Sequence, residues 1–266
     1  MDMRTVLITG ATSGIGLSIA NKLHENGFTV FGTSRFPEQH QHKVAFELLP
    51  MDITSEESIK SCLVALSART LVIDALINNA ENDLNGSAEE TSSALARSQF
   101  EINFWGTVNM TKAVLPLMRA QKSGQIITIG SLAGLVGIPF QSFYVASKYA
   151  LEGFFKSLRF EVKPFNIRIS VVEPAFFKTN LVQGFAYAEP TIAAYTKDRE
   201  NALSVYSSSI KNGPSPEPVA NVVLKILRTT RPQFSYRVGS DAKTLPVIQF
   251  LSYPLYEWGA ARRFNI

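Results

Sequence analysis

Short apolar segments alternate with helical patterns from residue 5 to about residue 172, and this alternation constrains the fold more than any other feature. Strands are expected at 5–9, 29–34, 45–49, 74–78, 125–129 and 167–172, and helices at 15–26, 55–68, 98–120 and 143–163. The expected strands are nearly continuous apolar runs, which is typical of parallel strands covered by helices on both faces. The alternation therefore predicts an α/β fold, a doubly wound parallel sheet of about seven strands with helices on both faces.

The composition fits one globular domain over residues 1–266. Hydrophobic residues make up 45% of the chain and charged residues 18%, which excludes a disordered protein. The single cysteine excludes an internal disulfide framework. The length of 266 residues would allow two domains, but single α/β domains of about 250 residues are common. Residues 175–215 form the least regular stretch and are rich in aromatic residues, so we expect an irregular substrate lid there.

Charge and hydropathy exclude several kinds of partner. The formal net charge is +4, but Lys and Arg are scattered, so we expect no nucleic-acid binding. No apolar stretch reaches the roughly 18 residues of a membrane-spanning helix, and no signal-peptide pattern is present, so we expect a cytoplasmic protein. Residues 245–258 are apolar but interrupted by Pro246 and Pro254, which leaves weak peripheral membrane contact open. His40 and His42 have no third ligand nearby, so no metal site is expected.

A glycine-rich turn follows the first expected strand and opens the first expected helix. Its sequence over residues 9–16 is TGATSGIG. Glycines at such a turn let the backbone approach a pyrophosphate, and the helix N-terminus supplies amide donors. The spacing differs from the G-x-G-x-x-G fingerprint, and an ordinary turn is the alternative. The candidate phosphate-binding residues are Gly10, Thr12, Ser13, Gly14, Ile15 and Gly16.

This loop resembles the cofactor loop of the short-chain dehydrogenase/reductase family, in particular its hydroxysteroid- and retinol-dehydrogenase-like members. Further motifs follow in the family's order: Asp52-Ile53, Asn78-Asn79-Ala80, Asn103, Ser131 and Tyr144-x-x-x-Lys148. The tyrosine lies 13 residues after the serine, as in the family. The resemblance implies a Rossmann-like fold and an NADP(H)-dependent oxidoreductase. It would transfer a hydride between the nicotinamide and a secondary carbonyl or alcohol.

Four residues form the expected catalytic set: Asn103, Ser131, Tyr144 and Lys148. Tyr144 and Lys148 are four apart in an expected helix, so their side chains share one face. A phenol is a poor base at neutral pH, and a neighbouring ammonium lowers its pKa. The resemblance implies that Tyr144 is the acid/base and that Lys148 also binds ribose. It further implies that Ser131 polarises the carbonyl and that Asn103 holds a proton-relay water.

The end of the second expected strand points to the form of the cofactor. Proteins that bind NAD often carry a carboxylate there for the ribose 2′-hydroxyl, whereas this chain has Ser34 and Arg35. A guanidinium suits a 2′-phosphate, so we expect NADP(H), and a solvated loop charge is the alternative reading of Arg35. The resemblance adds these cofactor-binding positions: Asp52, Ile53, Asn79, Ala80, Tyr144, Lys148, Pro174, Ala175, Phe177 and Thr179.

Two positions depart from the family pattern. Glu81 replaces the glycine of the NNAG motif, and Ala175 replaces the glycine of the Pro-Gly pair. Glu81 could strain the turn or place a negative charge near the ribose, and Ala175 could crowd the nicotinamide. Two alternatives to a dehydrogenase therefore stay open: a redox-neutral isomerase, cyclase or lyase on the same fold, and a non-catalytic NADP-binding sensor.

Aromatic residues in and near the irregular stretch bear on the substrate. They include Phe176, Phe185, Tyr195 and Tyr206. Ligand pockets are mostly apolar, so this composition favours a hydrophobic ketone or alcohol, although the aromatics could equally pack the lid or a subunit interface. The family resemblance implies a homodimer or homotetramer built on the helices at 98–120 and 143–163.

Overall fold

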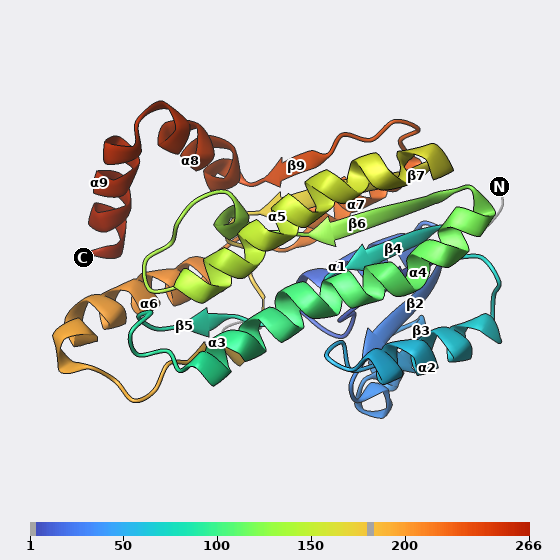
Figure 1. Ribbon diagram of the computed structural model, residues 1–266, viewed down its shortest axis with the longest axis horizontal. Helices are drawn as coiled ribbons and strands as arrows, with labels where there is room; N and C mark the ends of the chain where they lie inside the picture. The colour runs from blue at the N-terminus through green and yellow to red at the C-terminus, as the bar shows by residue number, and fades with distance from the viewer. Residues whose placement is uncertain (1–3, 180–183) are drawn as a thin grey trace.

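The computed structural model of the protein describes residues 4–179 and 184–266 (Figure 1). The strands are β1 (Thr5–Ile8), β2 (Thr29–Ser34), β3 (Glu47–Pro50), β4 (Ala75–Asn78), β5 (Leu84–Asn85), β6 (Gly124–Ile129), β7 (Ile167–Pro174), β8 (Ala186–Tyr187) and β9 (Ser235–Val238). The helices are α1 (Gly14–Glu25), α2 (Glu56–Ser67), α3 (Ser93–Phe100), α4 (Thr107–Gln121), α5 (Ser142–Val162), α6 (Thr196–Lys211), α7 (Glu217–Arg228), α8 (Ser240–Leu251) and α9 (Tyr253–Phe264). The π-helical segment η3 (Glu101–Gly106) joins α3 to α4, and the 3-10 turn η4 (Leu132–Gly134) follows β6.

A parallel sheet of seven strands, in the order β3-β2-β1-β4-β6-β7-β9, forms the centre of the molecule. Every neighbouring pair is parallel, so the predicted doubly wound sheet is confirmed. The order of the strands reverses at β1 and β4, and ligands of open α/β sheets bind beyond the carboxyl ends of strands at such a reversal. The sequence pattern does not predict β9, because this edge strand is short and only Val238 in it is buried.

Helices cover both faces of the sheet, as strand β1 illustrates. Val6 and Ile8 belong to the core that α1 and α7 close on one face. Leu7 belongs to the core that α2, α4 and α5 close on the other face (Figure 1). Successive side chains of a strand point to opposite faces, so an uninterrupted apolar run is what a strand buried on both sides requires.

The observed long helix differs from the one expected at 98–120 in its start and in its regularity. It begins at α3, where the Ser92 hydroxyl accepts a hydrogen bond from the Leu95 amide at 3.2 Å. The π-helical segment η3 then interrupts the α-helical hydrogen bonding around Asn103. Such π segments often occur at functional sites. Hydrophobic periodicity does not reveal a π segment, because such a segment changes the backbone hydrogen bonds and not the kind of residue that is buried.

The stretch 175–215, expected to be irregular, contains the 16-residue helix α6. Ala202, Tyr206 and Ile210 form its buried stripe at a spacing of four residues. The remaining positions are mostly polar or exposed, so the stripe is too narrow to give a clear sequence signal. Upstream of α6, β8 pairs with β5 and joins this stretch to the segment after β4. Residues 180–183 of the expected lid lie outside the described residues.

Helices α8 and α9 stand beyond the carboxyl ends of the central strands, and α9 lies beside α6 (Figure 1). Their sequence is the apolar stretch that the prolines interrupt, and several large side chains there are exposed, among them Phe250 (89%) and Trp258 (60%). Within residues 4–179 and 184–266, no helix combines the length and the apolar content needed to cross a membrane.

Candidate active site

A cavity of about 750 Å³ opens beyond the carboxyl ends of β1, β2, β4 and β6. The structure brings nearly all of the expected site residues to its wall. Those that line it are Gly10, Thr12, Ser13, Gly14, Ile15, Gly16, Ser34, Arg35, Asp52, Ile53, Asn79, Ala80, Ser131, Tyr144, Pro174, Ala175, Phe177 and Thr179. Lys148 and Asn103 do not line it, since both are buried behind the wall.

The glycine-rich turn has the shape of a phosphate cradle. Gly10 and Gly14 have φ values of +67° and +55°, which side chains rarely adopt. A methyl group on Gly16 would overlap the Gly10 carbonyl oxygen and the Asn79 amide. The N-cap residue Ser13 makes no side-chain cap hydrogen bond to the first turn of α1, and that turn holds no acidic residue. Its amide groups and the helix dipole are therefore available to an anion, and the turn fits a dinucleotide pyrophosphate.

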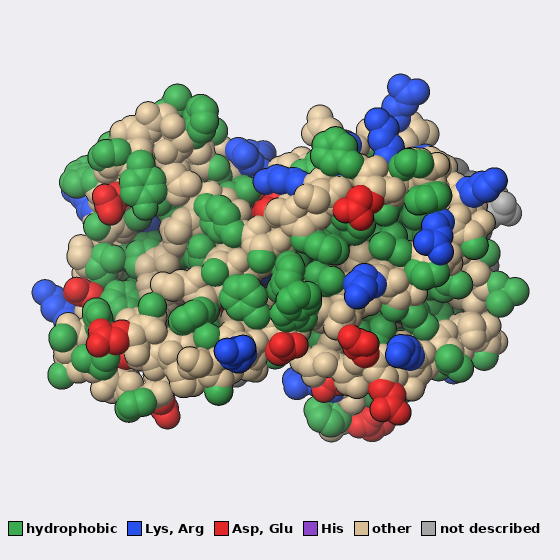
Figure 2. All heavy atoms as spheres, viewed as in Figure 1, with side chains coloured by type: hydrophobic (Ala, Val, Ile, Leu, Met, Phe, Trp, Pro, Cys, Tyr) green, Lys and Arg blue, Asp and Glu red, His purple; other side chains and the backbone are tan. Residues whose placement is uncertain are grey.

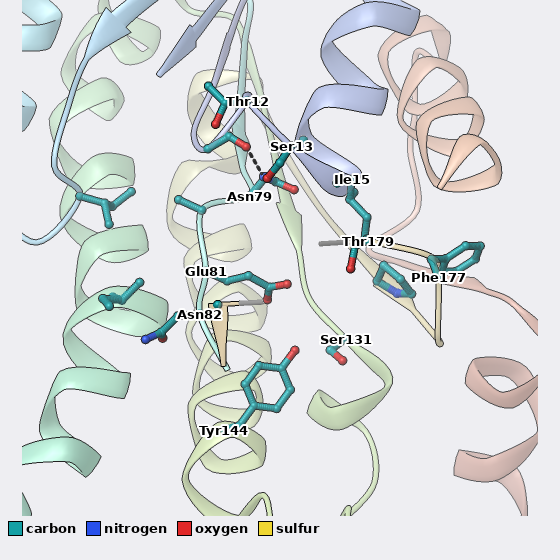
Figure 3. Close-up of a pocket in the computed structure, with 18 of the residues that line it drawn as sticks. Thr12, Ser13, Ile15, Asn79, Glu81, Asn82, Ser131, Tyr144, Phe177 and Thr179 are labelled. Carbon is teal, nitrogen blue, oxygen red and sulfur yellow. Dashed lines mark hydrogen bonds between the residues drawn. The ribbon is translucent and has the colours of Figure 1, made fainter. Parts of the chain in front are cut away.

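Asn79 connects this turn to the end of β4. Its side-chain amide donates to the carbonyl oxygens of Thr9 and Gly10, each at 3.0 Å (Figure 3). The hydroxyl oxygen of Thr9 accepts from the backbone amides of Asn79 (2.9 Å) and Ala80 (3.0 Å). These bonds hold two neighbouring strand ends in register, so Asn79 shapes the cradle.

Ser34, Arg35 and Asp52 lie together at one end of the cavity. Arg35 is exposed, its guanidinium lies 6.0 Å from the centre of the Phe36 ring, and among the described residues it forms no ion pair. Hydrogen bonds from the amide and hydroxyl of Thr54 lower the pKa of Asp52. This end therefore offers an uncommitted guanidinium beside an ionised carboxylate.

Ser131, Tyr144 and Glu81 converge at the opposite end from three segments of the chain (Figure 3). Tyr144 is buried on α5, and both Ser131 and Glu81 influence its hydroxyl group. Burial is the largest cause that raises the pKa of Tyr144 well above its usual value, followed by the negative charges of Glu81 and Asp83. The sequence predicts that Lys148 lowers this pKa, and the net direction is the opposite.

Lys148 lies behind Tyr144 with only 2% of its side chain exposed. Its ammonium group forms an ion pair with Glu81, donates to the Ile129 carbonyl oxygen at 3.3 Å, and lies 5.7 Å from the centre of the Tyr144 ring. The Glu81 carboxylate balances the charge of the ammonium, which explains why the lysine does not dominate the pKa of the tyrosine.

Asn103 connects the π-helical segment to the loop after β4. Its side-chain oxygen accepts from the Asn82 amide at 2.9 Å. Its side-chain nitrogen donates to the Asn82 carbonyl oxygen at 2.9 Å and to the Ser147 hydroxyl at 3.3 Å. Both amide hydrogens are therefore used within the protein, and a second lone pair on the oxygen is what remains for a water molecule.

A model of the family described as short chain dehydrogenase matches residues 4–189. The chain belongs to the short-chain dehydrogenase family. It is 35% identical over 260 residues to the 3-ketodihydrosphingosine reductase of Bacteroides thetaiotaomicron, covering 97% of this chain and 94% of that protein. It is 35% identical over 259 residues to retinol dehydrogenase 8 of Bos taurus, covering 89% and 82%. A solved short-chain dehydrogenase from Streptomyces avermitilis has a TM-score of 0.85 at 31% identity and covers 98% of each chain.

Membership makes the chain an oxidoreductase of the short-chain dehydrogenase family, and the structure accommodates both departures from the pattern. Positive φ among non-glycine residues of the described chain is limited to Lys122, Phe140, Asn166 and Asn265, so the backbone at Glu81 is not strained. Ala175 packs beside Gly239, where a methyl group would come within 2.9 Å of the alanine methyl. The glycine at the end of β9 leaves room for the alanine at the end of β7.

A buried polar network behind the cavity escaped the sequence analysis. Asp83 is fully buried, and its carboxylate accepts hydrogen bonds from the Tyr206 hydroxyl (2.6 Å) and the Gln141 amide (3.2 Å). Burial raises the pKa of Asp83 to about 7. Tyr206 reaches the cavity wall from α6. The run of polar residues after β4 is the signal for this network, but its partners lie up to 123 residues away.

Further residues line the cavity besides the expected catalytic and cofactor set. They are Thr33, Phe36, His40, Met51, Thr54, Glu81, Asn82, Ser98, Ile102, Gly130, Leu132, Ile138, Phe176, Gly184, Tyr206 and Ile210. Of these, the sequence singles out Glu81 as a departure from the family pattern and Phe176 and Tyr206 as aromatic residues that bear on the substrate. Most of the others are neighbours in sequence of the motif residues, so proximity to a motif is the signal that could have found them. The described residues contain no cluster of three or more His, Cys, Asp or Glu side chains that could hold a metal.

A second cavity, of about 300 Å³, adjoins the first. Leu132, Ile138 and Phe176 line both cavities. The other residues of the second cavity are Val136, Leu245, Ile248, Leu255, Tyr256, Trp258, Gly259, Ala260, Arg263 and Phe264, most of them from α8 and α9. Arg263 is ion-paired with Asp241 at 2.8 Å, and its guanidinium lies 5.3 Å from the centre of the Phe176 ring. We call this mostly apolar space the C-terminal chamber.

Proposed function

We propose that the protein is an NADP(H)-dependent short-chain dehydrogenase that transfers a hydride between nicotinamide and a secondary carbonyl or alcohol of a hydrophobic substrate. The convergence of Ser131 and Tyr144 on one cavity, with Lys148 directly behind the tyrosine, supports this most strongly. The phosphate cradle lies at the other end of the same cavity. The cofactor supplies or accepts the hydride, and the protein supplies orientation and the proton.

Each residue of the set has a distinct role in this proposal. The Ser131 hydroxyl donates a hydrogen bond to the substrate oxygen and polarises the carbonyl. The Tyr144 hydroxyl gives its proton to that oxygen in reduction, and the phenolate takes one back in oxidation. Lys148 balances the phenolate charge and binds the ribose. Asn103 holds the surrounding loop and offers the remaining lone pair of its oxygen to a relay water.

NADP(H) is the proposed form of the cofactor because of Arg35. The end of β2 presents a hydroxyl and an unpaired guanidinium, and no carboxylate follows Ser34. A guanidinium can bind a 2′-phosphate through two parallel hydrogen bonds, whereas it gains little from a ribose hydroxyl. The remaining cofactor positions are proposed to act as the family resemblance implies, with Asp52 at the adenine and Pro174 and Ala175 beside the nicotinamide. Ile53, Phe177 and Thr179 are proposed as further cofactor-binding residues.

The C-terminal chamber supports the choice of a hydrophobic substrate. It begins at Leu132, the residue after Ser131, so an apolar group on the substrate can extend from the reacting carbon into the chamber. The two named relatives, a 3-ketodihydrosphingosine reductase and a retinol dehydrogenase, are enzymes of lipids by their names. The stretch 175–215, with α6 inside it, would close over such a ligand as a lid.

The test is NADPH consumption against a panel of hydrophobic ketones, with Tyr144→Phe as the control. We expect turnover by the wild type and a loss on the order of 100-fold or more in the variant, because general acid catalysis contributes about that much. NADPH binding without oxidation by any substrate would favour a redox-neutral enzyme or a sensor over a reductase. Failure to bind either dinucleotide would remove the cofactor proposal.

We further infer a homo-oligomer that forms through α4 and α5. Large apolar side chains are exposed along this face: Trp105, Leu117, Tyr149 and Phe160. Hydrophobic side chains also gather over α4 and α5 in the space-filling view (Figure 2). Large exposed apolar patches usually mark an interface. Phe160→Glu, at a position 79% exposed, should shift the mass measured by light scattering from a dimer or tetramer toward a monomer. A wild-type monomer would contradict the inference.

A further inference from the structure

Glu81 occupies the centre of the reacting end of the cavity, at a position where the family has a glycine without a side chain. Its carboxylate forms an ion pair with the Lys148 ammonium, and its negative charge acts on the Tyr144 hydroxyl. One fifth of the Glu81 side chain is exposed, and the residue lines the cavity, so the carboxylate lies between the buried pair and the ligand space. This chain therefore carries a third ionisable group that is ion-paired with the lysine of its Tyr-Lys pair and acts electrostatically on the tyrosine.

The charges around Tyr144 come from several elements. Lys148 lies on the same helix, and Ser131 approaches from the end of β6. Glu81 and Asp83 both lie in the segment between β4 and β5, and both charges act on the tyrosine. Tyr206 on α6 also interacts electrostatically with Tyr144. Two carboxylates thus face one ammonium, and Glu81 is the carboxylate in contact with that ammonium.

We propose that Glu81 is a positioning residue that acts through Lys148 and Tyr144: it neutralises the ammonium and keeps the tyrosine as a neutral phenol, which adapts the chain to carbonyl reduction. The inference rests on the proposed function. In reduction, a bound reduced nicotinamide would supply the hydride for the carbonyl carbon. The C=O π pair then takes the proton of the Tyr144 hydroxyl, and the phenolate regains a proton from solvent. The oxidant is the carbonyl, and the reductant is the nicotinamide.

Oxidation of an alcohol needs Tyr144 as a phenolate. The alcohol proton must go to a phenolate, and a nearby carboxylate disfavours a second negative charge. The side chain of Glu81 therefore extends the pH range in which Tyr144 can donate a proton and narrows the range in which it can accept one. A glycine in its place would leave the Lys148 charge uncompensated beside the phenol.

The experiment compares the ionisation of Tyr144 in the wild type and in Glu81→Gln. Tyrosinate absorbance is titrated in each protein without ligands, and the same titration of its Tyr144→Phe counterpart is subtracted. We expect Tyr144 to ionise at a pH lower by about one unit or more in Glu81→Gln, since a neighbouring like charge shifts a pKa by that amount. The alkaline pH limit of carbonyl reduction and the acid pH limit of alcohol oxidation should both move to lower pH in Glu81→Gln.

Two further variants distinguish a specific effect of the Glu81 charge from a general effect of removing a carboxylate. Glu101→Gln removes a carboxylate from an exposed position outside the cavity lining and should leave the titration of Tyr144 unchanged. Glu81→Asp retains the negative charge, so Tyr144 in this variant should ionise at a pH close to that of the wild type. Unchanged ionisation in Glu81→Gln, or an equal shift in Glu101→Gln, would overturn the proposal. If the wild type reduces no carbonyl, the proposed function fails, while the titration still decides the role of Glu81.

Discussion

Single atoms, present or missing, decide whether a dinucleotide fits this site. Gly16 has no side chain where the Asn79 amide crosses to Gly10, so the loop closes against the end of β4 without overlap. Elsewhere in the cavity, Arg35 is exposed and forms no ion pair with any of the described residues. Glycine removes bulk where backbones meet, and arginine adds charge where a phosphate would lie. Both requirements are local, so both are visible in the sequence.

Arg35→Ala should weaken NADPH binding roughly tenfold to 100-fold and leave NADH binding nearly unchanged. A hydrogen bond to a charged group contributes about 1.5–3 kcal/mol, and about 1.4 kcal/mol corresponds to a tenfold change. Titration calorimetry with each dinucleotide measures both values. Arg231→Ala is the matched control, because Arg231 is exposed and lies outside the cavity lining. Equal losses for the two dinucleotides would show that Arg35 does not bind the 2′-phosphate.

Whole elements determine the shape of the substrate side. Helices α8 and α9 enclose the C-terminal chamber against the turn that follows Ser131. Their packing depends on a few contacts, such as the hydrogen bond from the Tyr256 hydroxyl to the Gly137 carbonyl oxygen. The outer surface of the same helices exposes Phe250 and Leu251. Two short helices thus form the wall of an apolar chamber and also present an apolar exterior.

Ala260→Phe should obstruct the C-terminal chamber and discriminate between substrates by length. We expect at least a roughly tenfold loss of kcat/KM for long-chain ketones and little change for short ones, since each buried methylene contributes about 0.8 kcal/mol. Assays across a series of chain lengths measure this. Glu257→Phe places the same side chain at an exposed position of α9 outside the chamber and is the control. A uniform loss at all chain lengths would refute a role for the chamber in holding the chain.

Buried carboxyl groups couple the stability of the whole molecule to pH. Burial raises the pKa of Glu173 to about 7, and the Ser235 hydroxyl, which donates to it at 2.9 Å, offsets this only in part. The unfolded chain has a carboxyl pKa of about 4.3, so the folded state binds more protons between these values. The stabilising contribution is complete below about pH 4 and is lost as the pH rises to about 7.

Glu173→Gln should therefore gain stability relative to the wild type as the pH rises from about 5 to about 8. A glutamine cannot ionise, so it avoids the burial of a charge. We expect the difference in the free energy of unfolding to change by about 1 kcal/mol or more in favour of the variant. Urea unfolding at several pH values measures it, with the exposed Glu161→Gln as control. A difference that stays constant with pH would contradict the assignment.

The sequence by itself determined the parallel sheet and the glycine-rich turn and placed Tyr144 and Lys148 on one helix face, while the family resemblance singled out Ser131, Tyr144 and Lys148. These features depend on local requirements: apolar continuity in a strand, missing side chains at a turn, and a spacing of four residues on a helix. It did not predict β9 or α6, because an edge strand and a narrow buried stripe have weak patterns. Their neighbours in space decide their conformation.

Only the tertiary structure decided what surrounds the reacting groups. Glu81 lies 67 positions before Lys148, and their ion pair forms because the segment after β4 lies against the first half of α5. The Asp83–Tyr206 bond and the C-terminal chamber likewise join segments that are distant in the chain. A pKa, a cavity and a counter-ion depend on distances between side chains. Those distances are set when the helices pack on the sheet, so no short stretch of the sequence determines them.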